Sequence, residues 1–359
     1  MEGDAMEQIA CIVGSVYIYW SSVIRILAAA AGVFAFFSLY LRRGAKPHAA
    51  VGYILLAVAL SLVLARMFHW YFRPDAYETP EAAWNLLLPG GFALIGVFAG
   101  CFLAAVLLRV TRATQNLPEL LDCVCLAGGL GIGVGRLASW FNASDRGMIM
   151  PETLGFPWAD MVINPVSGVT EYRLATFLLQ AIVAGWLFLI LLILYLAGEK
   201  NQNRRDGDAA LLFLLCYGAA QVLLDSTRYD SLSFRSNGFV SVVQVLSAAA
   251  MALVVILFAA RLVSTCGWNR KYLLVWIVQA GCFGLAGYME YYVQRYGGRA
   301  VFAYCVMGTA LAGIVILTLV TRQLTMVEEK KQLRKIFPVS GEGVRRQSNG
   351  DNEGKRQEI

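Results

Sequence analysis

The sequence predicts an all-α fold, a polytopic integral membrane helix bundle of about nine transmembrane helices. The chain has 359 residues, of which 58% are apolar and only 15% are charged. Its mean hydropathy of +0.60 is more than a water-soluble domain can carry on its surface. The apolar residues also fall in long runs separated by short charged segments. Helices satisfy their own backbone groups in lipid, and these runs are too long for barrel strands.

The apolar runs set the positions of the helices. A transmembrane helix rises 1.5 Å per residue and needs roughly 20 residues to cross the hydrocarbon core. Because the first residues, MEGDAMEQIA, are acidic and lack a cleavage pattern, we expect no removable signal peptide and a retained first helix. We expect nine helices, near residues 20–41, 49–68, 86–108, 117–136, 174–197, 209–225, 239–262, 272–290 and 301–321.

The distribution of Lys and Arg predicts the orientation. With the N-terminus outside and the C-terminus cytoplasmic, the inner segments hold 20 basic residues and the outer segments hold nine. Cytoplasmic loops of membrane proteins carry such an excess, which predicts a plasma membrane location. The net charge of +6 therefore reflects topology, and we expect no nucleic-acid partner because no basic stripe interleaved with aromatic residues is present.

The chain divides into three predicted parts. Residues 1–264 form the main membrane domain, and residues 265–321 add two further helices. Residues 322–359 form a charged cytoplasmic tail that continues the last helix and is partly disordered. Within the main domain, residues 143–173 contain several prolines and little regular pattern, which predicts an extracytoplasmic head segment.

Ionisable residues at the outer ends of three predicted helices are the first functional candidates. They are Arg66 with His69, Arg136, and Asp225 with Arg228. Such residues are costly at membrane depth unless they face one another or a polar cavity. The alternative is that each arginine only extends its long side chain toward the interface.

Polar neighbours favour a built site around Arg136. If the fourth helix continues, Ser139 lies one turn from Arg136 on the same face, and Asn142 follows three residues later.

The sixth predicted helix offers a matching face. Asp225 and Arg228 stand three residues apart, so the carboxylate can orient the guanidinium group. Gln221 and Tyr217 continue this face toward the membrane interior. Because a guanidinium group binds phosphate in a bidentate manner and keeps its charge, two of them at headgroup level suggest a phospholipid ligand.

Several stretches in chain order resemble one known family. GRLASWFNAS at 135–144 is similar to the signature G-R-x-G-N-F-x-N-x-E, and YGAAQVLLDSTRYD at 217–230 is similar to Y-G-x-x-R-F-x-x-E-F-x-R-x-P-D. Shorter matches are ARMFHWYF at 65–72, Asp122 fourteen residues before Arg136, Pro157-Trp158-Ala159, and QVLS at 244–247. Together, over roughly residues 15–262, they resemble the prolipoprotein diacylglyceryl transferase family.

The resemblance implies a function and a site. It implies seven family helices and transfer of a diacylglyceryl group from phosphatidylglycerol to the lipobox cysteine thiol of an exported prolipoprotein, in a bacterial plasma (inner) membrane. The partners would be phosphatidylglycerol, the prolipoprotein signal peptide and membrane lipids, with no cofactor and no metal. The implied catalytic residues are Arg136, Asn142, Asp225 and Arg228. The implied substrate-binding residues are Arg66, Asp122, Ser139, Tyr217 and Gln221.

The chain also departs from the family pattern. Family Asn and Glu residues are replaced by Ser139 and Ser144, and a family Arg and Glu by Gln221 and Asp225. A family His falls on Ile95 or Gly96, and a family Tyr falls on Ser21.

These losses leave the proton acceptor and the reaction open. His69 and Asp145 are candidate proton handlers. Besides the family reaction, two alternatives remain. One is a related transferase that uses another acceptor, and the other is a catalytically silent relative that binds anionic phospholipid or a lipoprotein precursor.

Overall fold

The chain folds as a bundle of helices, shown by a computed structural model that describes residues 8–14, 16–77, 79–85, 91–142, 144–163, 168–200, 205–234 and 241–336. Eight helices in this part are long and apolar enough to cross a membrane, and α3 is apolar but has 17 residues. The predicted all-α multi-pass membrane fold is therefore confirmed. The helices are α1 (Trp20–Arg42), α2 (Pro47–Phe72), α3 (Leu94–Val110), α4 (Leu117–Arg136), α5 (Thr176–Lys200), α6 (Asp208–Ser226), α7 (Val242–Cys266), α8 (Arg270–Tyr296) and α9 (Ala300–Ile336).

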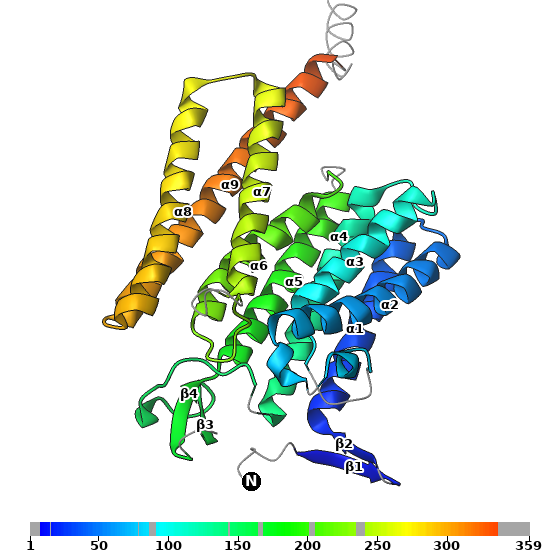
Figure 1. The fold of residues 1–359 in the computed structure, drawn as a ribbon. Helices are drawn as coiled ribbons and strands as arrows, with labels where there is room; N and C mark the ends of the chain where they lie inside the picture. The colour runs from blue at the N-terminus through cyan, green and yellow to red at the C-terminus, as the bar shows by residue number, and fades with distance from the viewer. Residues whose placement is uncertain are drawn as a thin grey trace, which may run out of the picture.

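Successive helices run in alternate directions through the bundle (Figure 1). The C-terminal ends of α2, α4, α6 and α8 therefore lie at one end, together with two β-hairpins. We call this end the hairpin face. The helix α9 ends at the opposite face and runs to Ile336, and the predicted tail beyond it, 337–359, lies outside the described residues.

Two β-hairpins at the hairpin face were not predicted. One pairs β1 (Ile9–Val13) with β2 (Val16–Tyr19), and the other pairs β3 (Ala159–Ile163) with β4 (Thr170–Leu174), both antiparallel. The second lies almost wholly within residues 143–173, where we expected little regular structure, and it ends at Leu174. In each hairpin the two strands satisfy each other's backbone N–H and C=O groups, in segments that lie outside the helices.

The third helix begins later than predicted. We expected it to start near residue 86, but α3 begins at Leu94, and residues 86–90 lie outside the described part of the chain. The sequence Pro89-Gly90-Gly91 explains the difference, because proline and glycine disfavour a helix interior. Gly91 also packs against His69, whose ring would lie 2.1 Å from a Cβ atom at this position.

Glycines bring α2 and α3 into close backbone contact. A Cβ atom on Gly96 would lie 2.4 Å from the backbone of Ala65, and one on Gly100 would lie 2.4 Å from the backbone of Ser61. The Ser61 hydroxyl donates across this contact to the Val97 carbonyl at 3.2 Å. Small residues that allow such approach are a common basis of helix association in membranes.

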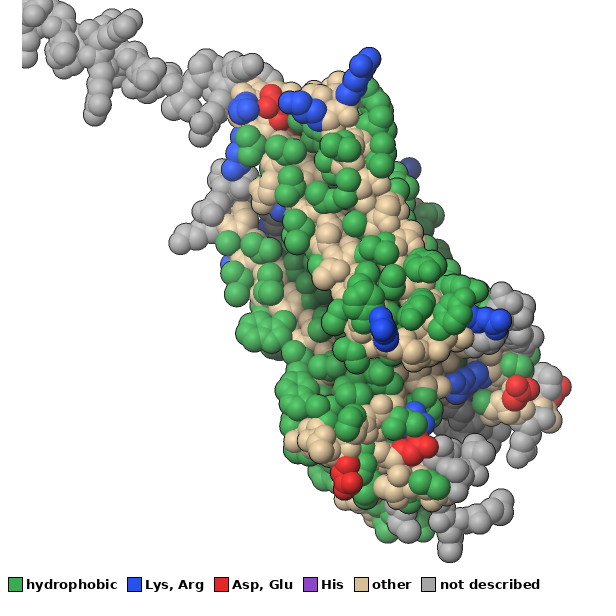
Figure 2. All heavy atoms as spheres, turned by 90° about the vertical axis from the view of Figure 1, so that its left-hand side faces the viewer, with side chains coloured by type: hydrophobic (Ala, Val, Ile, Leu, Met, Phe, Trp, Pro, Cys, Tyr) green, Lys and Arg blue, Asp and Glu red, His purple; other side chains and the backbone are tan. Residues whose placement is uncertain are grey.

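Of the two helices outside the family-like region, α9 packs on α6 and α7, and α8 packs on α9. Met307 and Ile314 of α9 are fully buried in a cluster with Leu215 of α6 and Met251 of α7. In contrast, α8 exposes large apolar side chains along its length, and hydrophobic side chains cover the middle of this side of the molecule (Figure 2). This exposed apolar surface matches a lipid-facing helix.

A polar contact joins α8 and α9 to the end of α6. The Ser226 hydroxyl donates to Glu290 Oε2 at 2.5 Å, and the Tyr304 hydroxyl donates to the Ser226 carbonyl at 3.3 Å. Ser226 directly follows Asp225 in the chain. The added helices therefore contact the helix end that carries a predicted site residue.

The close α2–α3 contact gives a stability prediction. We expect Gly100→Ala to lower the free energy of unfolding by about 1–3 kcal/mol, because the new methyl group would overlap the Ser61 backbone. The matched control is Gly52→Ala in α2, where an added Cβ atom would meet no heavy atom of another packed segment within 4 Å in the described part of the chain, and we expect a gain of about 0.5–1 kcal/mol from improved helix propensity. Thermal unfolding of the purified protein in detergent measures both, and equal melting temperatures would contradict the proposed packing.

Candidate functional site

Arg136 ends α4 and pairs with Asp145. The helix ends where it was expected to end, and a 3-10 turn, η3 (Leu137–Phe141), follows it, so the condition that α4 continues regularly through residue 142 is not met. Arg136 Nη1 donates to Asp145 Oδ1 at 2.8 Å, and the Ser139 hydroxyl donates to the second oxygen, Oδ2, at 2.6 Å. Ser139 thus lies in the site with Arg136, but it contacts the acid rather than the arginine.

Arg228 reaches the same carboxylate from another helix. It lies two residues beyond the end of α6, and its Nη2 atom lies 2.7 Å from Asp145 Oδ1. It also donates to Asp230 Oδ1 at 2.9 Å and to Asp225 Oδ1 at 3.3 Å. We call Arg136, Arg228, Asp145, Asp225 and Asp230 the arginine cluster. One oxygen atom of Asp145 therefore lies between two guanidinium groups.

Electrostatics keep Asp145 ionised. Burial alone would raise the pKa of this carboxyl, but the charges of Arg136 and Arg228 and the hydrogen bond from Ser139 hold it well below its usual range. Burial likewise opposes the charge on Arg228, yet the carboxylates of Asp145 and Asp230 raise its pKa. An acid with so low a pKa is a poor acceptor for a thiol proton, which weighs against Asp145 as the proton handler.

Asp225 is the buried end of the arginine cluster. Its side chain is fully buried, and the Ser241 hydroxyl at the start of α7 donates to Oδ2. Ser241 also caps α7 by accepting a hydrogen bond from the Val243 backbone at 3.2 Å. The predicted pairing of Asp225 with Arg228 is present. The hydrogen bond from Ser241 also joins Asp225 of α6 to the start of α7.

Arg146 holds the segment that carries Asp145, a role that the sequence did not indicate. Its guanidinium group donates to the backbone carbonyls of Ser139, Ser144 and Asn142 at 2.8–3.1 Å and to Asp160 Oδ2 at 2.6 Å. The Asp145 backbone amide also donates to Asp230 Oδ2 at 2.8 Å. The backbone around Asp145 is therefore fixed on both sides.

Three buried polar atoms lie on the membrane side of the arginine cluster. Tyr217 and Gln221 occupy the α6 face that ends at Asp225, and Gln180 of α5 donates to Gln221 Oε1 at 3.3 Å. None of Tyr217 Oη, Gln221 Nε2 and Gln180 Oε1 forms a full hydrogen bond within the described part of the chain, although Tyr217 interacts with the guanidinium group of Arg136. Buried polar atoms normally have partners, so these three mark a place where a polar ligand or water can bind.

Gln180 was missed at the level of sequence. It stands alone in the apolar run TFLLQAIVAGW. A polar side chain inside such a run is a functional candidate, and this signal could have found it.

Asn142 does not contact either arginine of the cluster. Its Oδ1 atom accepts hydrogen bonds from the Ser144 backbone amide at 3.1 Å and from the Ser144 hydroxyl at 2.5 Å. This is a local turn stabilised by the side chain. Asn142 therefore shapes the segment that leads to Asp145.

Arg66 and His69 lie near the end of α2, in a different set of contacts. Arg66 is 2% exposed, donates to the backbone carbonyls of Ala83 and Asn85, and lies over the Tyr77 ring. His69 Nδ1 is 2.9 Å from the Tyr77 hydroxyl. These contacts fasten the segment between α2 and α3 to the end of α2.

Asp122 lies far from the arginine cluster. Fourteen residues of helix separate it from Arg136, a rise of roughly 21 Å. Its oxygens accept hydrogen bonds from the backbone amides of Gly207 and Ala210 at 2.9 and 2.8 Å. Asp122 therefore satisfies the N-terminal amides of α6 at the opposite face, as helix-capping acids do.

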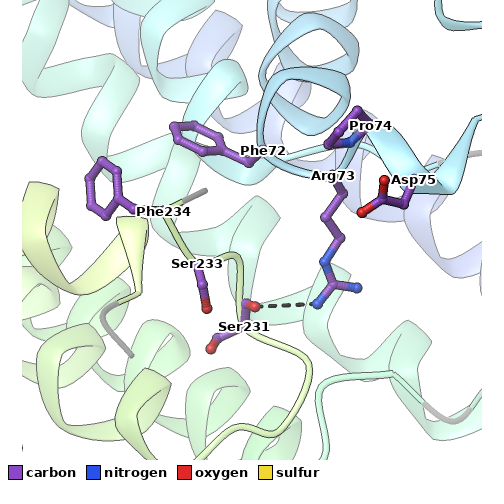
Figure 3. Close-up of a pocket in the computed structure, with 7 residues that line it drawn as sticks. All are labelled: Phe72, Arg73, Pro74, Asp75, Ser231, Ser233 and Phe234. Atoms are coloured by element: carbon purple, nitrogen blue, oxygen red, sulfur yellow. Dashed lines mark hydrogen bonds between the residues drawn. The ribbon is translucent and has the colours of Figure 1, made fainter. Parts of the chain in front are cut away.

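A cleft of about 570 Å³ opens beside the arginine cluster. Arg73 Nη2 donates across it to the Ser231 carbonyl at 3.2 Å (Figure 3). Arg73 Nη2 also donates to the Asp230 carbonyl at 2.9 Å, and the Asp230 side chain accepts from Arg228, so Asp230 connects the edge of the cleft to the arginine cluster. It is lined by Phe72, Arg73, Pro74, Asp75, Ser231, Ser233 and Phe234.

Fold and site together define a multi-pass membrane protein with a cluster of two arginines and three aspartates at one end of its helices. Within the described residues, no group of three or more His, Cys, Asp or Glu side chains could hold a metal ion.

Comparison with known proteins identifies the family. The model of the prolipoprotein diacylglyceryl transferase family matches residues 8–260, and the chain belongs to this family. A Bacillus licheniformis protein named phosphatidylglycerol–prolipoprotein diacylglyceryl transferase is 26% identical over 260 residues, covering 69% of this chain and 92% of that protein. Proteins of the same name from Lactococcus lactis subsp. cremoris and Lactiplantibacillus plantarum are each 25% identical, covering 72% and 64% of this chain and 95% and 80% of their own lengths.

Proposed function

We propose that this protein transfers the diacylglyceryl group of phosphatidylglycerol to the thiol of a lipobox cysteine in an exported prolipoprotein, at a bacterial plasma membrane. One observation carries the proposal. Arg136 and Arg228, at the ends of two apolar helices, meet at a single anionic oxygen. The ends of membrane-spanning helices lie at the level of lipid headgroups, where the phosphate of a lipid is found.

The arginine cluster suits a phosphate diester. The two guanidinium groups hold Asp145 Oδ1 at 2.8 and 2.7 Å, the distances of strong charge-assisted hydrogen bonds. A phosphate diester offers the same charge and the same kind of oxygen. We therefore assign Arg136 and Arg228 to the lipid phosphate and Asp225 to orienting Arg228.

The buried polar atoms below the cluster suit the uncharged part of the lipid. Moving inward from the phosphate, a diacylglycerol phospholipid presents its glyceryl carbons and then its ester groups. Tyr217 and Gln221 can donate to ester oxygens, and Gln180 holds Gln221 in place. The glyceryl carbon that bears the phosphate would then lie between the arginine cluster and these three residues.

The reaction needs stabilisation of a leaving phosphate. The cysteine sulfur forms a bond to this glyceryl carbon, the carbon–oxygen bond to phosphate breaks, and glycerol phosphate leaves with the electron pair. The phosphate changes from one negative charge to two, and the product dianion can take up the thiol proton. Fixed guanidinium groups at a developing charge lower the barrier of such a step.

The catalytically silent alternative is kept open by one observation. Gln221 stands where the family has an arginine, and it pairs with another neutral side chain, Gln180. The cluster therefore has one cation fewer than the family motif implies. Lipid binding without turnover is the expected behaviour of a silent relative.

Turnover by the purified protein tests the proposed function. With phosphatidylglycerol and a lipobox peptide, we expect mass spectrometry to find a diacylglyceryl adduct on cysteine and released glycerol phosphate. We expect Arg136→Ala and Arg228→Ala to reduce the rate by about 100-fold or more, as loss of a fixed charge stabiliser does. Arg295→Ala is the control, because Arg295 is an exposed arginine at the end of α8 on the same hairpin face. Lipid binding without any adduct would support the silent alternative.

The buried polar residues give a second prediction. We expect Gln180→Leu to raise KM for phosphatidylglycerol by about tenfold, since loss of a buried hydrogen-bond partner costs about 1–3 kcal/mol. The control is Gln279→Leu in α8, which replaces a buried glutamine paired with Thr318 at 3.0 Å. Steady-state kinetics, corrected for folded protein, compare the two. An equal effect on KM in both variants would show that Gln180 has only a structural part.

A further inference from the structure

We propose that Asp145 is a resident counter-anion that the lipid phosphate displaces, so that this carboxylate sets the affinity and anion selectivity of the arginine cluster. The inference rests on the proposed function, because it concerns the same anion site. Asp145 would weaken the binding of the phosphate by competing with it, whereas Arg136 and Arg228 bind the phosphate.

The geometry leaves one position for both anions. Asp145 Oδ1 is within 2.8 Å of Arg136 Nη1 and within 2.7 Å of Arg228 Nη2. A phosphate oxygen that contacts both guanidinium groups through these atoms must take the position of Oδ1. The two anions are therefore competitors for one place.

The net charge of the arginine cluster favours replacement of the Asp145 carboxylate by the phosphate over binding of the phosphate in addition to it. The ion pairs of the cluster join two guanidinium groups to three carboxylates, so the cluster carries one net negative charge. Adding a phosphate diester to it would place two net negative charges in a poorly solvated site. If the phosphate replaces the carboxylate of Asp145, the net charge at the guanidinium groups stays the same.

The carboxylate of Asp145 can leave without moving the chain. It lies outside the helices and strands, and its side chain is 15% exposed. Its backbone is fixed, because its amide donates to Asp230 and its carbonyl accepts from the Phe177 amide at 3.1 Å. The exchange therefore takes the form of a side-chain rotation, which would also free the Ser139 hydroxyl for the phosphate.

The backbone conformation at Asp145 limits which substitutions can be used to test the exchange. Its φ angle is +59°, in the left-handed region that asparagine and glycine tolerate and alanine does not. Asp145→Asn removes the charge and keeps the shape, and Asp145→Gly removes the whole side chain. Neither introduces backbone strain, so at least one can be expected to fold.

A matched control is available on the hairpin face. Asp160 forms a 2.6 Å ion pair with Arg146 and has no ion pair with Arg136 or Arg228. Asp160→Asn changes the net charge of the protein by the same amount. It therefore separates a local exchange from a general gain in positive charge.

The experiment measures lipid binding by the full chain in detergent. Phosphatidylglycerol is titrated into the native protein and into the Asp145→Asn, Asp145→Gly and Asp160→Asn variants, with melting temperatures as the check of folding. We expect both Asp145 variants to bind phosphatidylglycerol about tenfold more tightly, a coupling of ordinary size between competing anions. We expect Asp160→Asn to stay within about twofold of the native protein, and Asp145→Gly alone to bind inorganic phosphate measurably.

The outcomes separate this inference from the proposed function. If folded Asp145 variants bind the lipid equally or more weakly while Arg136→Ala abolishes binding, Asp145 is a permanent part of the site and the exchange is wrong. In that case the proposed function stands. If neither the native protein nor any variant binds phosphatidylglycerol, the proposed function and the exchange are both wrong.

Discussion

The ion pairs that join two guanidinium groups to the carboxylate of Asp145 are the interaction on which the hairpin face depends. Arginines that end apolar helices cannot be left uncompensated, because an unpaired charge in a poorly solvated site is costly. The acids that compensate them come from three places in the chain, namely Asp145 before the second hairpin, Asp225 at the end of α6, and Asp230 beyond it. Pairing the charges therefore fixes the positions of α4, α6 and the segment between α4 and α5 at once.

The surrounding structure supports this cluster from several sides. Arg146 holds the backbone before Asp145, and Ser241 connects Asp225 to α7. The contact of Ser226 with Glu290 extends the support to α8, outside the region that matches the family. A site whose residues lie at or next to helix ends and are fixed by neighbouring hydrogen bonds is suited to hold a ligand in one geometry.

The helices could be predicted because their apolar runs are long, and no competing pattern interrupts most of them. The start of α3 was predicted too early, because apolar residues occur on both sides of Pro89-Gly90-Gly91 and were counted as one run. The helix itself begins only at Leu94. The hairpins were missed because strands of four or five residues give a weak periodic signal.

The part of the site that could be predicted consists of charged residues at the ends of apolar runs, because such residues can be recognised in the sequence. Arg136, Asp225 and Arg228 come together as expected. The bridge made by Asp145 could not be predicted, because it depends on a left-handed turn and on the approach of α6 to α4. Asp122 was predicted as a site residue from its spacing to Arg136 along α4. It instead accepts hydrogen bonds from the start of α6 at the opposite face, because spacing along one helix does not show at which face a residue makes its contacts.

The most direct test of the central claim is an experimental structure of the full chain with phosphatidylglycerol bound. We expect the lipid phosphate within about 3 Å of both Arg136 Nη1 and Arg228 Nη2, the distance of a charge-assisted hydrogen bond. We also expect the Asp145 carboxylate to be turned away from this position. A lipid phosphate bound elsewhere, with Asp145 still bridging the two arginines, would contradict it.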